Sequence, residues 1–110
     1  MGMSASEIAE VYNLENGKQI MDATFMDSAL DIKQTIPKYD GMGKTKVLKQ
    51  FFNTKTLNDA KIPLLIVSYN LTSRNIELFE KSEFPDYKIV DIANATSAAP
   101  CYFPPYQVII

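Results

Sequence analysis

The chain has 110 residues and a net charge of −2 at pH 7, with 46% hydrophobic and 22% charged residues. These values predict one globular domain with a modest core. Basic residues are spread along the chain and form no basic stripe, so we expect no nucleic-acid partner. The chain has no histidine and one cysteine. It therefore cannot by itself supply a histidine-containing triad or an internal disulfide, and it lacks the commonest zinc ligand.

No apolar run approaches the roughly 20 residues of a membrane span. The first residues also lack the charged and apolar regions of a signal peptide. From these features we expect a cytoplasmic protein, in contact with a membrane only at its periphery.

The first predicted helix runs from Ser6 to Leu14. Ser4 and Glu7 have the spacing of a capping box, in which each side chain accepts a hydrogen bond from the backbone N–H of the other. One apolar face follows at helical spacing: Ile8, Val11 and Tyr12. We expect Asn16-Gly17 to end this helix with a left-handed position. A short turn is predicted from Lys18 to Met21.

Residues 22–38 show no sustained period. Their carboxylates lack calcium-loop spacing, so we expect a solvated face: Asp22, Asp27 and Asp31. The apolar positions of the next segment predict a helix from Lys44 to Asn53: Val47, Leu48, Phe51 and Phe52. Polar side chains would cover its other face: Lys44, Lys46, Lys49 and Gln50. These lysines and Lys55 could touch lipid headgroups or only keep the helix soluble.

The run from Ile62 to Tyr69 is apolar almost throughout, which predicts a strand buried on both faces. A polar turn follows, and alternating apolar residues then indicate a shorter and more exposed strand: Ile76, Leu78 and Phe79. Helical spacing of small and apolar residues predicts a last helix from Lys88 to Ala99, which Pro100 ends. The fold class is therefore α/β.

The run Ala95-Thr96-Ser97-Ala98-Ala99-Pro100, followed by Cys101-Tyr102-Phe103-Pro104-Pro105, resembles a hallmark of the patatin-like phospholipases. Other features occur in that family's order: a Tyr39-Asp40-Gly41 loop before a helix, then a hydrophobic strand, a second strand and a small-residue helix. The resemblance covers nearly all of residues 1–110, which we interpret as one partial patatin-like domain. It implies part of a three-layer α/β/α sandwich related to the α/β-hydrolases, with no metal or organic cofactor.

Such enzymes hydrolyse lipid acyl esters with a Ser-Asp dyad. The serine lies in a Gly-x-Ser-x-Gly motif, and the aspartate lies in an Asp-Gly-Gly or Asp-Gly-Ala motif after the Pro-Pro segment. This sequence contains neither motif, and Asp40-Gly41 is followed by Met42 and precedes the hallmark. Acyl transfer needs a nucleophile, a base and oxyanion donors. We therefore assign no catalytic residue, and whether the chain is itself an enzyme stays open.

Three aromatic residues near the hallmark are candidates to line an acyl-chain pocket or to pack a proline-rich turn: Tyr102, Phe103 and Tyr106. We expect the Ser97 hydroxyl to bond a backbone carbonyl one turn back. Cys101 is expected to be an inert, partly buried thiol. Gly41-Met42-Gly43-Lys44 lacks the first glycine of a phosphate loop, which favours a turn before a helix.

Three hypotheses follow for the chain. It is a partial patatin-like protein that is inactive alone, a non-catalytic relic that binds lipid or protein, or one part of a split enzyme. An isolated apolar strand leaves unpaired edges, so we also expect self-association or a complementing chain.

Overall fold

A computed structural model describes residues 2–21 and 39–109. The predicted carboxylate face at Asp22, Asp27 and Asp31 lies outside these residues. In chain order the elements are helices α1 (Ala5–Val11), α2 (Leu14–Ile20) and α4 (Met42–Phe52), the 3-10 turn η1 (Leu57–Asp59), strands β1 (Leu65–Asn70) and β2 (Asn75–Glu80), and helix α5 (Ile89–Thr96). The mixture confirms the α/β class.

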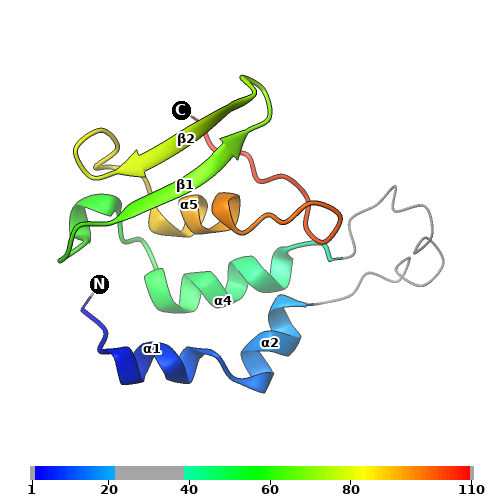
Figure 1. The fold of residues 1–110 in the computed structure, drawn as a ribbon. Coiled ribbons are helices and arrows are strands. Elements are labelled where there is room, and N and C mark those ends of the chain that lie inside the picture. The colour runs from blue at the N-terminus through cyan, green and yellow to red at the C-terminus, as the bar shows by residue number, and fades with distance from the viewer. Residues whose placement is uncertain (1, 22–38, 110) are drawn as a thin grey trace.

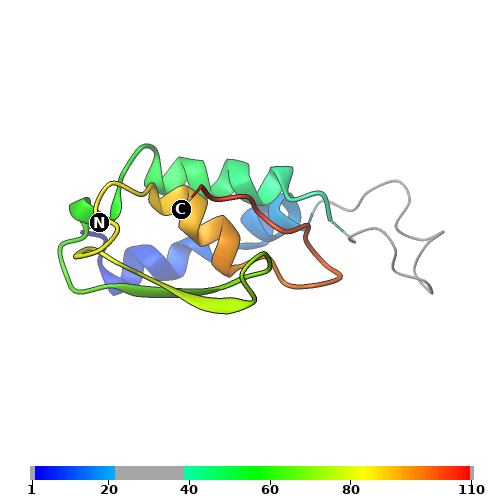
Figure 2. The same cartoon turned by 90° about the horizontal axis from the view of Figure 1, so that it is seen from above.

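The elements pack in a fixed succession from the hairpin to the N-terminal helices (Figure 1). Helix α5 packs against β1 on one side and α4 on the other, and α2 packs against α4. Figure 2 shows the hairpin as a layer with the helices gathered on one of its faces. The described residues thus form two layers, an antiparallel hairpin and a group of helices.

The N-terminal region contains two short helices where the sequence predicted one helix and a turn. The capping box is confirmed: the Glu7 N–H donates to Ser4 Oγ at 3.2 Å, and the Ser4 N–H donates to Glu7 Oε1 at 3.1 Å. The predicted end at Asn16-Gly17 is wrong. Asn13 caps a second helix by accepting from the Asn16 N–H at 2.8 Å, and Gly17 lies inside that helix. A side-chain cap at Asn13 thus outweighs the roughly 1 kcal/mol helix penalty of Gly17.

The hairpin β1–β2 pairs antiparallel, with Ile66 opposite Phe79 and Tyr69 opposite Ile76. Its turn is held by Asn70, whose side-chain oxygen accepts from the Thr72 N–H at 2.9 Å. The prediction that this strand is buried on both faces is wrong for the described residues. Burial alternates along β1, because only one face of the hairpin lies against the helices. The other face exposes five large apolar side chains: Leu65, Val67, Tyr69, Ile76 and Leu78.

The core lies between β2, η1 and α5. Its most buried members are Leu57, Phe79, Ile89 and Ile92. Around it pack Phe52, Leu64, Ile66, Phe84 and Tyr87. Two backbone hydrogen bonds fix the start of α5 on this core, from the Leu57 N–H to the Tyr87 carbonyl at 3.0 Å and from the Ile89 N–H to the Lys55 carbonyl at 2.9 Å. They orient the helix that leads into the hallmark.

Helix α5 ends at Thr96, three residues before the predicted end. The Ser97 N–H still donates to the Ala93 carbonyl at 3.1 Å, but the Ala98 N–H turns to the Ala95 carbonyl at 3.3 Å. Pro100 disfavours a helical conformation at the residue before it. The hallmark therefore continues as a turn, and not as a helix, from Ser97 onward.

Candidate functional site

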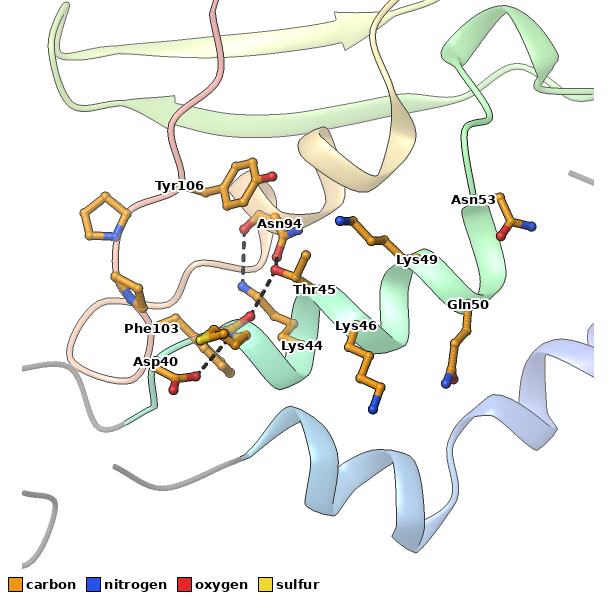
Figure 3. A pocket seen from close by; sticks show the side chains of 14 residues that line it. Asp40, Lys44, Thr45, Lys46, Lys49, Gln50, Asn53, Asn94, Phe103 and Tyr106 are labelled. Carbon is orange, nitrogen blue, oxygen red and sulfur yellow. Dashed lines mark hydrogen bonds between the residues drawn. The ribbon is translucent and has the colours of Figure 1, made fainter. Parts of the chain in front are cut away.

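A pocket of about 690 Å³ lies between α4 and the segment that follows the hallmark, residues 103–106 (Figure 3). Its polar lining comes mainly from α4 and its apolar lining from the segment: Phe103, Pro104, Pro105 and Tyr106. The volume lies within the range of roughly 300–1,000 Å³ that is common for small-molecule sites. This pocket is the candidate site.

One wall of the pocket is fixed where the entrance to α4 meets the hallmark turn. The Tyr39 N–H donates to the Tyr102 carbonyl at 2.7 Å, and the rings of Tyr39 and Phe103 lie 5.5 Å apart. Gly41 has a φ of 83°, a left-handed conformation that glycine adopts at little cost. Asp40 Oδ1 then accepts from the Met42 N–H at 2.9 Å, at the start of the helix. The Asp40-Gly41 pair is thus the entrance to α4.

Lys44 lies under this wall with only 6% of its surface exposed. The prediction that it lies on the solvated face of its helix is wrong. Lys44 and Val47 are three residues apart on the same helical face, and both are buried. The Lys44 ammonium donates to the Asn94 carbonyl at 3.3 Å and lies 4.2 Å from the centre of the Phe103 ring. Burial lowers the pKa of Lys44 from its usual value.

Asn94 joins α4 and α5 from the centre of their contact. It is 1% exposed, and its side-chain amide is used at both ends. The Thr45 hydroxyl donates to Asn94 Oδ1 at 3.2 Å, and Asn94 Nδ2 donates to the Val90 carbonyl at 3.2 Å. Such a satisfied polar group fixes the relative position of the two helices, because a shift would leave buried donors unpaired.

The three predicted pocket residues fall in different surroundings. Phe103 and Tyr106 line the pocket, whereas Tyr102 is 52% exposed and is absent from its lining. The Tyr106 hydroxyl donates to Asp91 Oδ1 at 2.8 Å. Burial, followed by this hydrogen bond and the charge of Asp91, raises the pKa of Tyr106. A role for these three residues in holding an acyl chain stays a prediction.

A second groove, of about 1,080 Å³, runs between the hairpin and residues 95–108. Both Thr96 and Val67 line this groove, and the Thr96 hydroxyl donates to the Val67 carbonyl at 2.5 Å. Phe103 and Tyr106 line this groove as well as the first pocket. The segment that carries the aromatic residues therefore separates the two cavities.

The expectations for Ser97 and Cys101 have different outcomes. The Ser97 hydroxyl donates to the Ala93 carbonyl at 2.6 Å, which confirms the predicted bond one turn back, although Ser97 caps the helix end. Cys101 is exposed, so its predicted partial burial is wrong. Cys101 lies in the turn after Pro100, where its φ of 71° is in the left-handed region.

No sequence pattern predicted the burial of Asn94, and the helical spacing of Lys44 and Val47 was the one available signal for the buried lysine. Within residues 2–21 and 39–109, no group of three or more acidic or thiol side chains could hold a metal ion. In the same residues, no helix is both long and apolar enough to cross a bilayer. The site is therefore built from lysine, amide, hydroxyl and aromatic groups.

A hairpin backed by helices, with the hallmark turn packed on α4, places the chain in the class of α/β proteins. The profile of the patatin-like phospholipase family matches residues 1–108, and the chain belongs to that family. It is similar to Patatin-17 of Solanum cardiophyllum, with 30% identity over 111 residues that cover 96% of this chain and 27% of that protein.

Two further relatives match shorter stretches. A cGAMP-activated phospholipase of Pseudomonas aeruginosa is 34% identical over 73 residues, which cover 61% of this chain and 22% of the relative. Patatin-12 of Solanum tuberosum is 33% identical over 78 residues, covering 66% of this chain and 20% of the relative. The chain thus spans about a quarter of the length of the curated relatives that it matches.

Proposed function

We propose that this chain is the part of a patatin-like lipid acyl hydrolase that supports the catalytic centre and does not carry it. The match of residues 1–108 to the family carries the proposal, because it joins the chain to phospholipases over almost its full length. The parent reaction would be hydrolysis of a lipid acyl ester through an acyl-enzyme on serine. The serine and aspartate would come from sequence outside this chain.

This chain would contribute by holding parts of the catalytic centre in position. The hallmark turn is held to β1 by Thr96, to the entrance of α4 by the Tyr39–Tyr102 backbone bond, and to α5 by Tyr106. Groups that hold a reacting site within a fraction of an ångström sustain catalysis without touching the substrate. We infer that the turn and its neighbouring aromatic residues form such a support, with Phe103 and Tyr106 beside the acyl chain.

The test is ester hydrolysis by the purified chain, with a short-chain p-nitrophenyl ester as substrate. We expect no turnover above that of a Ser97→Ala variant, because the Ser97 hydroxyl donates its proton to the Ala93 carbonyl. Sustained turnover by the wild-type chain, lost in Ser97→Ala, would contradict the proposal. Sustained turnover in both would show that another residue of this chain is the nucleophile.

A second candidate is one part of a split enzyme, and the outer face of the hairpin favours it. Five large apolar side chains on this face are between 48% and 64% exposed. Contiguous apolar surface of this kind is typical of an interaction site. A complementing chain that carries the Gly-x-Ser-x-Gly motif should co-elute with this chain and restore ester hydrolysis. Failure of every such chain to bind would rule this candidate out.

The exposed apolar face of the hairpin also allows a test of the hypothesis that the chain is a non-catalytic relic. If the chain only binds lipid, it should sediment with phosphatidylcholine vesicles while showing no ester turnover, alone or with a complementing chain. We also propose a reducing compartment such as the cytoplasm, in which the exposed thiol of Cys101 persists, with peripheral contact to a membrane.

A further inference from the structure

The pocket between α4 and residues 103–106 contains a buried cation that has no acidic partner among the described residues. Lys44 is almost fully buried, and desolvation alone accounts for its lowered pKa. No carboxylate of the described residues contributes to that pKa. The partners of its ammonium are a carbonyl and an aromatic ring, both uncharged. The positive charge of Lys44 is therefore not paired with a described carboxylate, in surroundings where a charge is weakly screened.

A second ammonium lies on the same side of the pocket. In Figure 3, Lys49 extends from α4 toward Asn94 and Tyr106, whereas Lys46 extends toward α2. Lys49 is exposed, so its amine is free to meet a ligand without further desolvation. Together with Lys44 it gives the lining one buried and one exposed ammonium group.

Two carboxylates near the pocket already accept hydrogen bonds from the protein. Among the described residues, Asp40 alone is acidic in the lining, and its Oδ1 accepts from the Met42 N–H at the start of α4. Asp91 accepts from the Tyr106 hydroxyl and is absent from the lining. With three lysines and one aspartate, the lining carries a net charge of +2 (3 − 1 = 2).

Apolar groups adjoin the buried cation, because the Phe103 ring lies 4.2 Å from the Lys44 ammonium and two prolines follow it in the lining. A pocket in which ammonium groups adjoin an aromatic ring and prolines suits an anionic group that carries a short apolar stem. Its volume of about 690 Å³ accommodates a phosphorylated headgroup with its first few carbons. Phosphate esters meet the lysines as charge-assisted hydrogen-bond acceptors.

We propose that this pocket binds the phosphate ester of a lipid headgroup, with Lys49 as the contacting cation and Lys44 as the buried charge behind it. The proposal rests on the proposed function, which makes lipids the ligands of this family member. It adds a site for the phosphate on α4, apart from any residue that attacks the ester.

Two measurements with the 110-residue chain test it. Inorganic phosphate is titrated into isotope-labelled chain, and the backbone amide signals of Thr45, Lys49 and Asn94 are followed by nuclear magnetic resonance. Sedimentation is then measured with phosphatidylcholine vesicles, with and without phosphatidic acid. Lys49→Gln is the test variant, and Lys81→Gln is its control, because Lys81 is exposed and lies outside both cavities. Both variants remove one positive charge.

We expect phosphate to shift the three signals and phosphatidic acid to strengthen vesicle binding. Lys49→Gln should weaken both about fivefold, the effect of one lysine at an anionic surface, while Lys81→Gln should change neither by more than about twofold. Equal loss in the two variants would overturn the site in favour of a general charge effect. Absence of the signal shifts would also overturn it.

The two probes separate the sources of phosphate. Shifts with inorganic phosphate but no response to phosphatidic acid would overturn the lipid assignment and leave a site for soluble phosphate. Failure of the proposed function is distinguishable from failure of this site. Ester turnover by the chain would contradict the proposed function without changing phosphate binding. Loss of phosphate binding would overturn this site but would not bear on the origin of the nucleophile.

Discussion

Replacement of Asn94 by alanine tests whether polar contacts hold α4 on α5. The variant loses two side-chain hydrogen bonds inside a contact where Asn94 is 1% exposed. Each such bond contributes a net free energy of about 1 kcal/mol, so unfolding should become easier by roughly 2 kcal/mol. In the variant the single hydroxyl proton of Thr45 is left to the Gly41 carbonyl, 3.0 Å from its oxygen, which limits the additional penalty of an unpaired hydroxyl.

The measurement is urea unfolding followed by far-ultraviolet circular dichroism. In thermal unfolding, the same loss of 2 kcal/mol corresponds to a fall in Tm of about 9 °C for this chain, given an unfolding entropy near 2.1 cal/mol/K per residue. Asn58→Ala is the matched control, because Asn58 is exposed and should change stability by less than about 0.5 kcal/mol.

A double-mutant cycle with Thr45→Val assigns part of the loss to the Thr45–Asn94 bond. We expect a coupling free energy of about 0.5–1 kcal/mol between the two substitutions. A loss below about 0.5 kcal/mol for Asn94→Ala, without coupling to Thr45, would refute the reasoning. The helices would then be held by apolar packing alone.

Further expectations concern the backbone, the core and the thiol. Gly17→Ala should stabilise the chain by about 0.4–1 kcal/mol, because Gly17 is helical with open space around it. Gly41→Ala should destabilise the chain by about 1 kcal/mol, because Gly41 has a φ of 83°. Urea unfolding checks both, since the two changes in unfolding free energy should have opposite signs. Leu57→Ala should lower stability by about 3 kcal/mol, against less than about 0.5 kcal/mol for exposed Leu71→Ala, and similar losses would contradict the assigned core. Cys101 should react with Ellman's reagent in the folded chain at the rate seen in urea, and strong protection would show that the turn after Pro100 is misplaced.

Local signals in the sequence predicted several elements well. The Ser4–Glu7 spacing located the first capping box, and the spacing of Val47, Leu48, Phe51 and Phe52 located α4 to within two residues at its start and one at its end. The bond of the Ser97 hydroxyl also followed from its position in a helix. Each of these features depends on residues at most seven positions apart.

Features that depend on distant residues were missed. The burial of Lys44 is decided by Asn94 and Phe103, which lie at least 50 positions along the chain. The alternating exposure of β1 depends on which face the helices cover, and an apolar run is equally apolar on both. The second N-terminal helix was missed for another reason, because Asn16-Gly17 is a common helix end and only the cap at Asn13 overrides it.

Residues 102–109 hold the pocket wall without belonging to a helix or strand. A few separate hydrogen bonds hold them, among them the Tyr106 hydroxyl to Asp91 and the Tyr87 hydroxyl to the Ile109 carbonyl at 2.7 Å. A substitution could therefore displace this wall while every helix and strand stays intact. Circular dichroism would record a native spectrum for such a variant, so conformational screening of this family member needs a probe of the aromatic side chains themselves.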